Sequence, residues 1–181
     1  MNSKSDEQLI HDHAELGDLL NQLDAALEAK DVARTHATLD LFWARLAMHI
    51  RAEHLHLFPT ISRVASRSRR NGDDQTLPPH EPDNTIAILH DDHDFFMREL
   101  SQAVAITRGL VGNSEGNIAE HLEEVNKRIA AVRDRLVQHN EIEENGIYVW
   151  SSKLLNEDER SVLASQVQKE LKNLPPRFGG I

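Results

Sequence analysis

The sequence contains no cysteine, which excludes disulfides, thiolate zinc sites, cysteine-ligated iron–sulfur clusters and cysteine nucleophiles. Aromatic residues make up only 4% of the 181 residues, which argues against a β-sandwich, because its strands are rich in aromatic and β-branched side chains. With 8 glycines and 6 prolines, the chain is also poor in the residues that build loops. These shortages favour a helical protein.

Basic residues are scarce relative to acidic ones, 20 against 30, and the formal net charge is −10. Nucleic-acid binding needs clustered lysine and arginine, so we expect no nucleic-acid partner. No segment approaches the ~18 consecutive apolar residues that a membrane helix requires, and the first seven residues contain no apolar signal-peptide core. We therefore expect a cytoplasmic location without membrane association. The sequence does not indicate which proteins, if any, are partners.

Apolar residues recur at alternating steps of three and four in four segments, at residues 9–27, 39–57, 86–104 and 118–150. This spacing places them on one face of a helix. We predict an all-α fold, an antiparallel up-down four-helix bundle with a short fifth helix beginning near Asn156. The predicted division is a bundle at 6–151 and a C-terminal helix and tail packed on it at 152–181. The second helix should continue past Pro59, with a kink or break there.

Eleven histidines are present, and several of them interrupt the apolar stripes. Five histidines and two glutamates occupy positions suited to leucine or isoleucine: His13, His49, Glu53, His90, His93, His139 and Glu143. Each buried polar group without a partner costs several kcal/mol. A shared metal ion would satisfy them together, because imidazole and carboxylate are both good ligands.

The spacing of these residues strengthens the prediction of a metal site. His49 and Glu53 are four residues apart, as are His139 and Glu143, so each pair shares one side of its helix. The order along the chain is His, HxxxE, His, HxxxE, which predicts a pseudo-twofold bundle made of two helical hairpins. Such a bundle would suit a dinuclear site in which each glutamate bridges two metals.

The histidines also allow other interpretations. Glu53 and His56 form an ExxH motif typical of ferritin-like sites, but that fold needs a second ExxH, and none is found. The roles of His54 and His56 stay open. We expect four histidines to be solvated, and three aromatic residues to pack in the core or line a pocket near the metals: His11, His36, His80 and His121, and Phe42, Tyr148 and Trp150.

The pattern resembles the hemerythrin-like, or HHE cation-binding, family over roughly residues 8–150. That resemblance implies a four-helix bundle with a non-haem di-iron centre, bridged by oxo or hydroxo, and places six residues on ligand positions: His13, His49, Glu53, His93, His139 and Glu143. His90 is the candidate for an additional ligand, because the oxygen carriers place two histidines on the third helix. The carriers space these by four, whereas His90 and His93 are three apart.

A second departure from the carriers concerns the fourth helix. Glu144 stands where the carriers have an aspartate, but Glu143 lies in the stripe and is the preferred ligand. By resemblance, we expect a di-iron protein that binds O2 or a related small ligand, NO or peroxide. The alternatives are a di-iron enzyme that consumes peroxide or nitric oxide, and a metal-handling protein without redox turnover. Whether the protein is an enzyme stays open.

Overall fold

The computed structural model describes residues 4–71, 81–111 and 117–178, and these residues contain helices and no strand. The long helices are α1, α2, α4 and α5, at Lys4–Glu28, Val32–Ala52, Glu81–Val111 and Ile118–Ile142. The shorter elements are η1 (Glu53–Leu57), α3 (Phe58–Asn71), η2 (Glu143–Ile147), α6 (Tyr148–Leu154), α7 (Glu157–Leu171) and η3 (Pro176–Phe178). The prediction of an all-α protein is confirmed.

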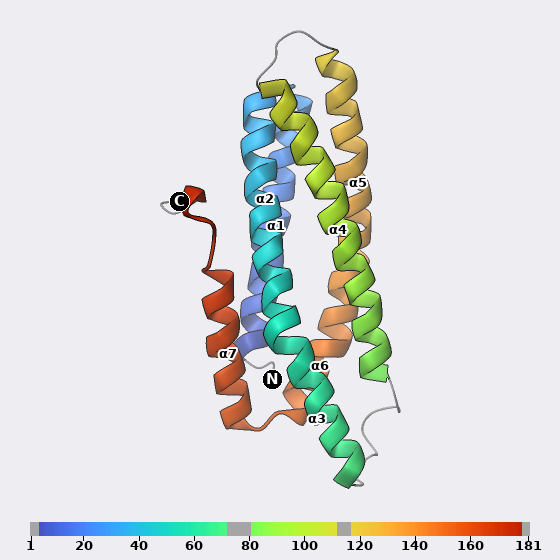
Figure 1. Cartoon of the computed structure of the whole chain (residues 1–181), viewed down its shortest axis with the longest axis vertical. Coiled ribbons are helices and arrows are strands. Elements are labelled where there is room, and N and C mark those ends of the chain that lie inside the picture. The colour runs from blue at the N-terminus through green and yellow to red at the C-terminus, as the bar shows by residue number, and fades with distance from the viewer. Residues whose placement is uncertain (1–3, 72–80, 112–116, 179–181) are drawn as a thin grey trace.

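The long helices lie side by side in one helical bundle (Figure 1). Helix α1 packs against α2, α2 against α4, and α4 against α5. Helix α2 continues through η1 into α3, and α5 continues through η2 into α6, so that two of the rods extend beyond the shared core. Among the described helices, none is both long and apolar enough to cross a membrane.

Both extended rods contain one turn of π-helix at equivalent places. In η1 the Phe58 N–H donates to the Glu53 carbonyl, and in η2 the Tyr148 N–H donates to the Glu143 carbonyl, each five residues back. The expected disturbance near Pro59 is therefore a π turn immediately before the proline. Because η2 has the same geometry without a proline, proline alone does not explain the turn. Single π turns are frequent at functional sites.

Two apolar clusters fill the bundle, one on each side of a polar layer. The first is built on residues such as Leu16, Leu46 and Phe96, and the second on residues such as Leu9 and Leu89. His13 lies in the sequence between Leu9 and Leu16, and the other stripe histidines divide the two clusters in the same way. The polar layer is therefore enclosed by apolar side chains at both ends.

Helix α7 covers one side of the bundle by packing against α1, α2 and η1 (Figure 1). It begins at Glu157, close to the expected start, and its N-cap Asn156 forms a reciprocal capping box with Glu159. Two ion pairs join α7 to α2 and α3: Arg51 pairs with Glu170 at 2.8 Å, and Arg67 pairs with Glu159 at 2.9 Å. Apolar contacts also hold α7 in place, because its Leu163, Ala164 and Val167 are buried.

Candidate metal centre

Six side chains from four rods meet in the polar layer, and we call them the central cluster: His13, His49, Glu53, His93, His139 and Glu143. The histidines come from α1, α2, α4 and α5, and each glutamate begins a π turn. The ligand atoms of Glu53, His93, His139 and Glu143 lie within 4.8 Å of one another, as do those of His13, His49 and Glu143. The bundle thus brings together six of the seven residues predicted as ligands.

The four histidines form two pairs. The Nε2 atoms of His13 and His49 are 3.2 Å apart, and those of His93 and His139 are 3.1 Å apart. Two nitrogens that bind one metal ion, each through a bond of about 2.0–2.1 Å, lie at about this separation when their bonds are near a right angle. Each pair therefore has the spacing of two adjacent ligands.

The two glutamates connect the histidine pairs. Glu53 Oε1 lies 3.2 Å from His49 Nε2, and its Oε2 lies 3.3 Å from His93 Nε2. Glu143 Oε1 lies 3.2 Å from His139 Nε2, and its Oε2 lies 3.3 Å from His13 Nε2. Each carboxylate therefore reaches one histidine of each pair, which is the arrangement of two bridging ligands.

Both carboxylates are fully buried, and the pKa of each is nevertheless lowered. Burial alone raises the pKa of Glu143, but the facing His139 and His13 outweigh burial and hold this pKa well below its usual value. Burial and the nearby Glu143 raise the pKa of Glu53. The facing His49 and His93 lower this pKa by more, so that the net shift is also downward. The cluster therefore contains two negative charges that need cations.

The imidazoles balance these charges when no metal is bound. Burial alone lowers the pKa of His139, but Glu143 reverses this effect and raises the pKa to about 9. Burial also lowers the pKa of His49, whereas Glu53 and Asp12 hold it well above its usual value. Metal cations would take over this positive charge, because a metal-bound imidazole is neutral.

The donor set fits two divalent cations. Among the described residues, none donates a hydrogen bond of good geometry to either oxygen of Glu53 or to Glu143 Oε1, and each of these oxygens faces a histidine Nε2 at 3.2–3.3 Å instead. A buried carboxylate oxygen without a donor is costly, and coordination to a cation removes that cost. Imidazole nitrogen and carboxylate oxygen are ligands for divalent first-row metals. The geometry therefore suits a dinuclear site with both glutamates as bridges.

An aspartate from a neighbouring helix orients each HxxxE histidine. Asp12 Oδ2 accepts a hydrogen bond from His49 Nδ1 at 2.9 Å, and Asp92 Oδ2 accepts one from His139 Nδ1 at 3.1 Å. Burial raises the pKa of Asp12, but the hydrogen bond and charge of His49, together with Arg45, outweigh burial and lower that pKa. Such partners fix the tautomer of a metal-binding histidine and direct its other nitrogen to the metal.

An arginine anchors each of these aspartates in turn. Arg45 donates to Asp12 Oδ1 at 2.5 Å and also to Glu15, and Arg135 donates to Asp92 Oδ1. Both arginines lie four residues before the histidine that their aspartate orients. The two halves of the site therefore repeat the same chain of contacts, from arginine to aspartate to histidine.

The other two histidines are oriented by different partners. His13 Nδ1 lies 3.1 Å from Glu144 Oε1, and His93 Nδ1 lies 2.7 Å from His54 Nε2. Glu144 and His54 occupy the same relative place, one residue after Glu143 and Glu53. The halves of the site thus differ here, with a carboxylate in one and an imidazole in the other.

His90 lies outside the central cluster, although it was predicted as a ligand. Its ring meets the ring of His54 edge-on, with the centroids 4.2 Å apart. Ligand atoms of His54, His90 and His93 lie within 4.8 Å of one another, and we call these residues the outer histidine cluster. Burial, followed by the neighbouring His93 and His90, lowers the pKa of His54 to about 4. His54 is therefore neutral at physiological pH.

One aromatic side chain packs beside each half of the central cluster. The hydroxyl of Tyr148 donates to Glu143 Oε2 at 3.2 Å and lies 3.4 Å from His13 Nε2. Burial, together with Glu143, raises the pKa of this phenol well above its usual value, so that it is a neutral donor. Phe58 takes the equivalent place in the other half and stacks on His93, with the centroids 6.0 Å apart. Tyr148 therefore lines the site.

The remaining histidines lie away from the central cluster. His11 is 76% exposed, and His121 is also exposed. His36 is half-buried and bonds to Thr107 at 2.9 Å, while His56 lies 3.8 Å from Glu170. His80 lies outside the described residues. Phe42 and Trp150 are buried in the apolar clusters.

Sequence reasoning missed the residues that orient the ligands. An Asp-His dipeptide occurs both at Asp12 and at Asp92, but the sequence alone does not reveal the role of these aspartates. Arg45 and Arg135 extend the two HxxxE motifs to RxxxHxxxE, a repeat that could have indicated a shared partner. These contacts join different helices, so that spacing along one helix does not reveal them.

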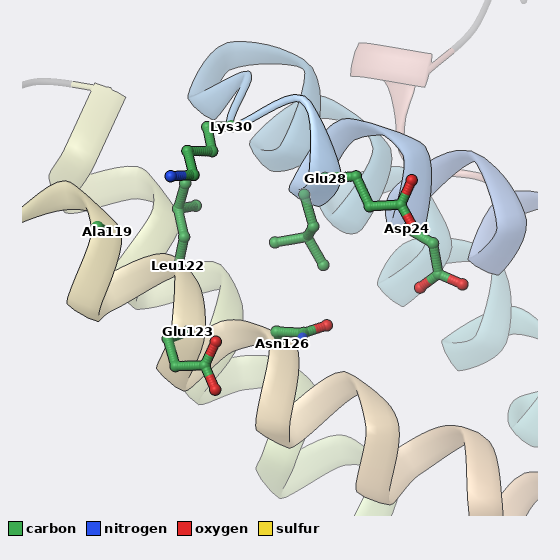
Figure 2. A pocket seen from close by; sticks show the side chains of 8 residues that line it. Asp24, Glu28, Lys30, Ala119, Leu122, Glu123 and Asn126 are labelled. Atoms are coloured by element: carbon green, nitrogen blue, oxygen red, sulfur yellow. The ribbon is translucent and has the colours of Figure 1, made fainter.

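A separate hollow of about 230 Å³ lies between the end of α1 and the start of α5 (Figure 2). Its polar lining includes Asp24, Glu28, Lys30 and Glu123, and its eight lining residues contain no histidine. His13 lies about 11 residues before Asp24 on α1, a rise of about 16 Å. This hollow therefore has no direct part in the central cluster.

Comparison with known proteins assigns the family. A family model described as "Hemerythrin HHE cation binding domain" matches residues 5–151, which is most of the chain and includes the whole central cluster. No curated protein and no solved structure matches at a significant level. With the match spanning most of the sequence, the chain belongs to the hemerythrin HHE cation-binding domain family.

Proposed function

We propose that this protein is a non-haem di-iron protein that binds O2 or a related small ligand, NO or peroxide, at a dinuclear centre formed by the central cluster. The proposal depends most on one observation, that Glu53 and Glu143 each reach one histidine of both pairs. A single ion would leave one histidine pair without a metal. The choice of iron follows from the family, and the mixed imidazole and carboxylate donors are compatible with it.

Several parts of the fold belong to the same proposal. We propose an antiparallel up-down four-helix bundle at 6–151 with a C-terminal helix and tail at 152–181. The match over residues 5–151 and the packing of α7 on α1 and α2 support this division. A cytoplasmic location and the absence of nucleic-acid partners stay predictions.

The protein's own residues would control ligand access and charge. A bound pair of ferrous ions would supply the two electrons needed to reduce O2 to the peroxide level. The apolar clusters on both sides of the polar layer exclude bulk water. The Tyr148 hydroxyl, at 3.2 Å from Glu143 Oε2, is a neutral hydrogen-bond donor at the site. The aspartate and arginine contacts hold the imidazoles in place while a ligand enters and leaves.

The test begins with the metal content and optical spectrum of the purified protein. Iron is loaded anaerobically and counted by elemental analysis, and O2, NO and peroxide are then added in turn. We expect two irons per chain and a visible absorption change with O2 that reverses when the O2 is removed. Glu143→Gln should lose the two-iron load, whereas Glu141→Gln, which changes an exposed carboxylate two residues away, should keep it.

The outcomes separate the competing functions. Rapid bleaching with catalytic loss of peroxide or NO would indicate an enzyme, and two bound metals without any spectral response would indicate metal handling. Retention of a full two-metal load by both Glu53→Gln and Glu143→Gln would contradict the assignment of the site itself.

A further inference from the structure

We infer that the outer histidine cluster, His54, His90 and His93, is a second metal site that holds one divalent cation of the zinc or copper class beside the dinuclear centre. Each residue offers a ring nitrogen, and the three nitrogens lie within 4.8 Å of one another. The inference goes beyond the proposed function, because His54 and His90 belong to no part of the central cluster.

The rings converge from two elements onto one point. His54 comes from η1, while His90 and His93 are one turn apart on α4. His54 Nε2 lies 2.7 Å from His93 Nδ1, and the rings of His54 and His90 meet at a centroid distance of 4.2 Å. The Phe58 ring packs against all three, at centroid distances of 5.8, 5.5 and 6.0 Å, and forms an apolar wall.

His93 would serve both sites through different nitrogens. Its Nε2 faces the central cluster, 3.3 Å from Glu53 Oε2, and its Nδ1 faces His54. Coordination of a cation there would require the proton between His93 Nδ1 and His54 Nε2 to leave to solvent, so that His93 would bind as an imidazolate. Two ligands of a tetrahedral ion lie about 3.4 Å apart with bonds of about 2.1 Å. The His54 ring must therefore move outward by several tenths of an ångström, which its half-buried position allows.

The donor type selects the ion. Three imidazoles without a carboxylate suit zinc and copper ions, with a water in the fourth position. His54 and His90 are half-buried, so that a cation and its water can reach them from solvent.

The other half of the bundle lacks this arrangement, which makes it an internal comparison. Ile10 stands three residues before His13, where His90 stands before His93, and Glu144 replaces His54. One half therefore offers two further imidazoles beside His93, those of His54 and His90, and the other offers a single carboxylate beside His13. His54 and His90 have no equivalent histidines in the other half, so the twofold repeat of the central cluster does not account for their presence.

The experiment counts zinc and iron in the same full-length protein. Wild-type protein is loaded with iron, exposed to a small excess of Zn²⁺, desalted and measured by elemental analysis. His90→Gln and His54→Gln are the test variants, and His11→Ala, which removes an exposed histidine, is the control for adventitious zinc. Circular dichroism and the Tm verify that each variant is folded.

We expect one zinc per chain in addition to the iron in the wild type and in His11→Ala, and none in His90→Gln or His54→Gln, with the iron content of His90→Gln unchanged. Absence of the extra zinc in the wild type, or its persistence in both variants, would overturn the inference. Loss of iron from His90→Gln would also overturn it, because His90 would then belong to the dinuclear centre. If the wild type binds no iron pair, but His90→Gln binds one zinc fewer than the wild type, the proposed function fails and the zinc site stands.

Discussion

Asp12 and Asp92 take the same place in the two halves of the central cluster, one residue before His13 and His93. Asp92→Ala removes the acceptor of His139 Nδ1, so that this buried ring loses its fixed tautomer and orientation. We expect the metal affinity to fall by about 10–100-fold, measured by competition with a chelator of known affinity. Asp91→Ala, which alters the exposed neighbour, is the control, and equal affinities of the two variants would contradict the role given to Asp92.

Tyr148 offers a second test at the scale of one atom. Tyr148→Phe removes only the hydroxyl that donates to Glu143 Oε2 and leaves the buried ring in place. We expect the metal-free protein to lose about 1 kcal/mol of unfolding free energy, measured by urea denaturation, because the buried carboxylate loses a donor. The variant should still bind two metals, since Glu143 keeps both oxygens. An unchanged stability would show that the hydroxyl does not serve this carboxylate.

The positions of the ligands were largely predictable from spacing, because residues four apart must share a helix face. His13, His49, His93, His139 and both glutamates do meet in one layer, although metal binding by them stays a prediction. The place of His90 was not predictable, since a three-residue offset from His93 leaves its ring direction open. Contacts such as that between Asp12 and His49, 37 residues apart, depend on how two helices are rotated against each other.

At the scale of elements, the docking of α7 depends partly on charge. The hydrogen bond from Arg67 is the main reason that the pKa of Glu159 lies below its usual value of 4.5. A carboxyl group whose pKa is lowered by folding stabilises the protein above its unfolded pKa, and the effect is lost as the pH falls through the lowered value. The contribution of this pair should therefore be present at pH 7 and disappear in acid below 4.5.

Glu159→Gln tests this dependence. Glutamine keeps the reciprocal hydrogen bonds of the capping box with Asn156 but removes the charge that faces Arg67. We expect a small decrease in Tm at pH 7 that vanishes as the pH falls below 4.5. Glu157→Gln, in the same first turn, is the control for loss of charge at the helix start. A Tm difference between Glu159→Gln and wild type that persists in acid would exclude the ion pair as its cause.

The helices themselves were predictable, whereas the two π turns were not. Alternating steps of three and four indicate a helix, but a π turn adds one residue and shifts the stripe beyond it. The signal in retrospect is a pair of adjacent apolar residues, Leu57-Phe58 and Ile147-Tyr148, all four of which are buried. The expected kink was attributed to Pro59. The disturbance is a π turn that occurs in both halves of the bundle, and η2 has no proline.

At the scale of the whole molecule, metal and fold should be linked. Cations that bind only the folded state add about 3–4 kcal/mol of stability at 100–1,000 times their Kd, and each kcal/mol moves the Tm by about 2–4 °C for a chain of this size. We therefore expect a chelator to lower the Tm of the iron-loaded protein by roughly 10 °C. Thermal unfolding of Glu143→Gln should respond little, and a chelator effect of equal size in this variant would contradict the link.

The most direct test of the account is an anomalous-difference map, measured at the iron edge, from crystals of the iron-loaded protein. The account predicts two peaks about 3.5–4 Å apart, one beside each histidine pair of the central cluster and both within bonding distance of Glu53 and Glu143. A single peak at full loading, or iron bound away from these two carboxylates, would contradict it.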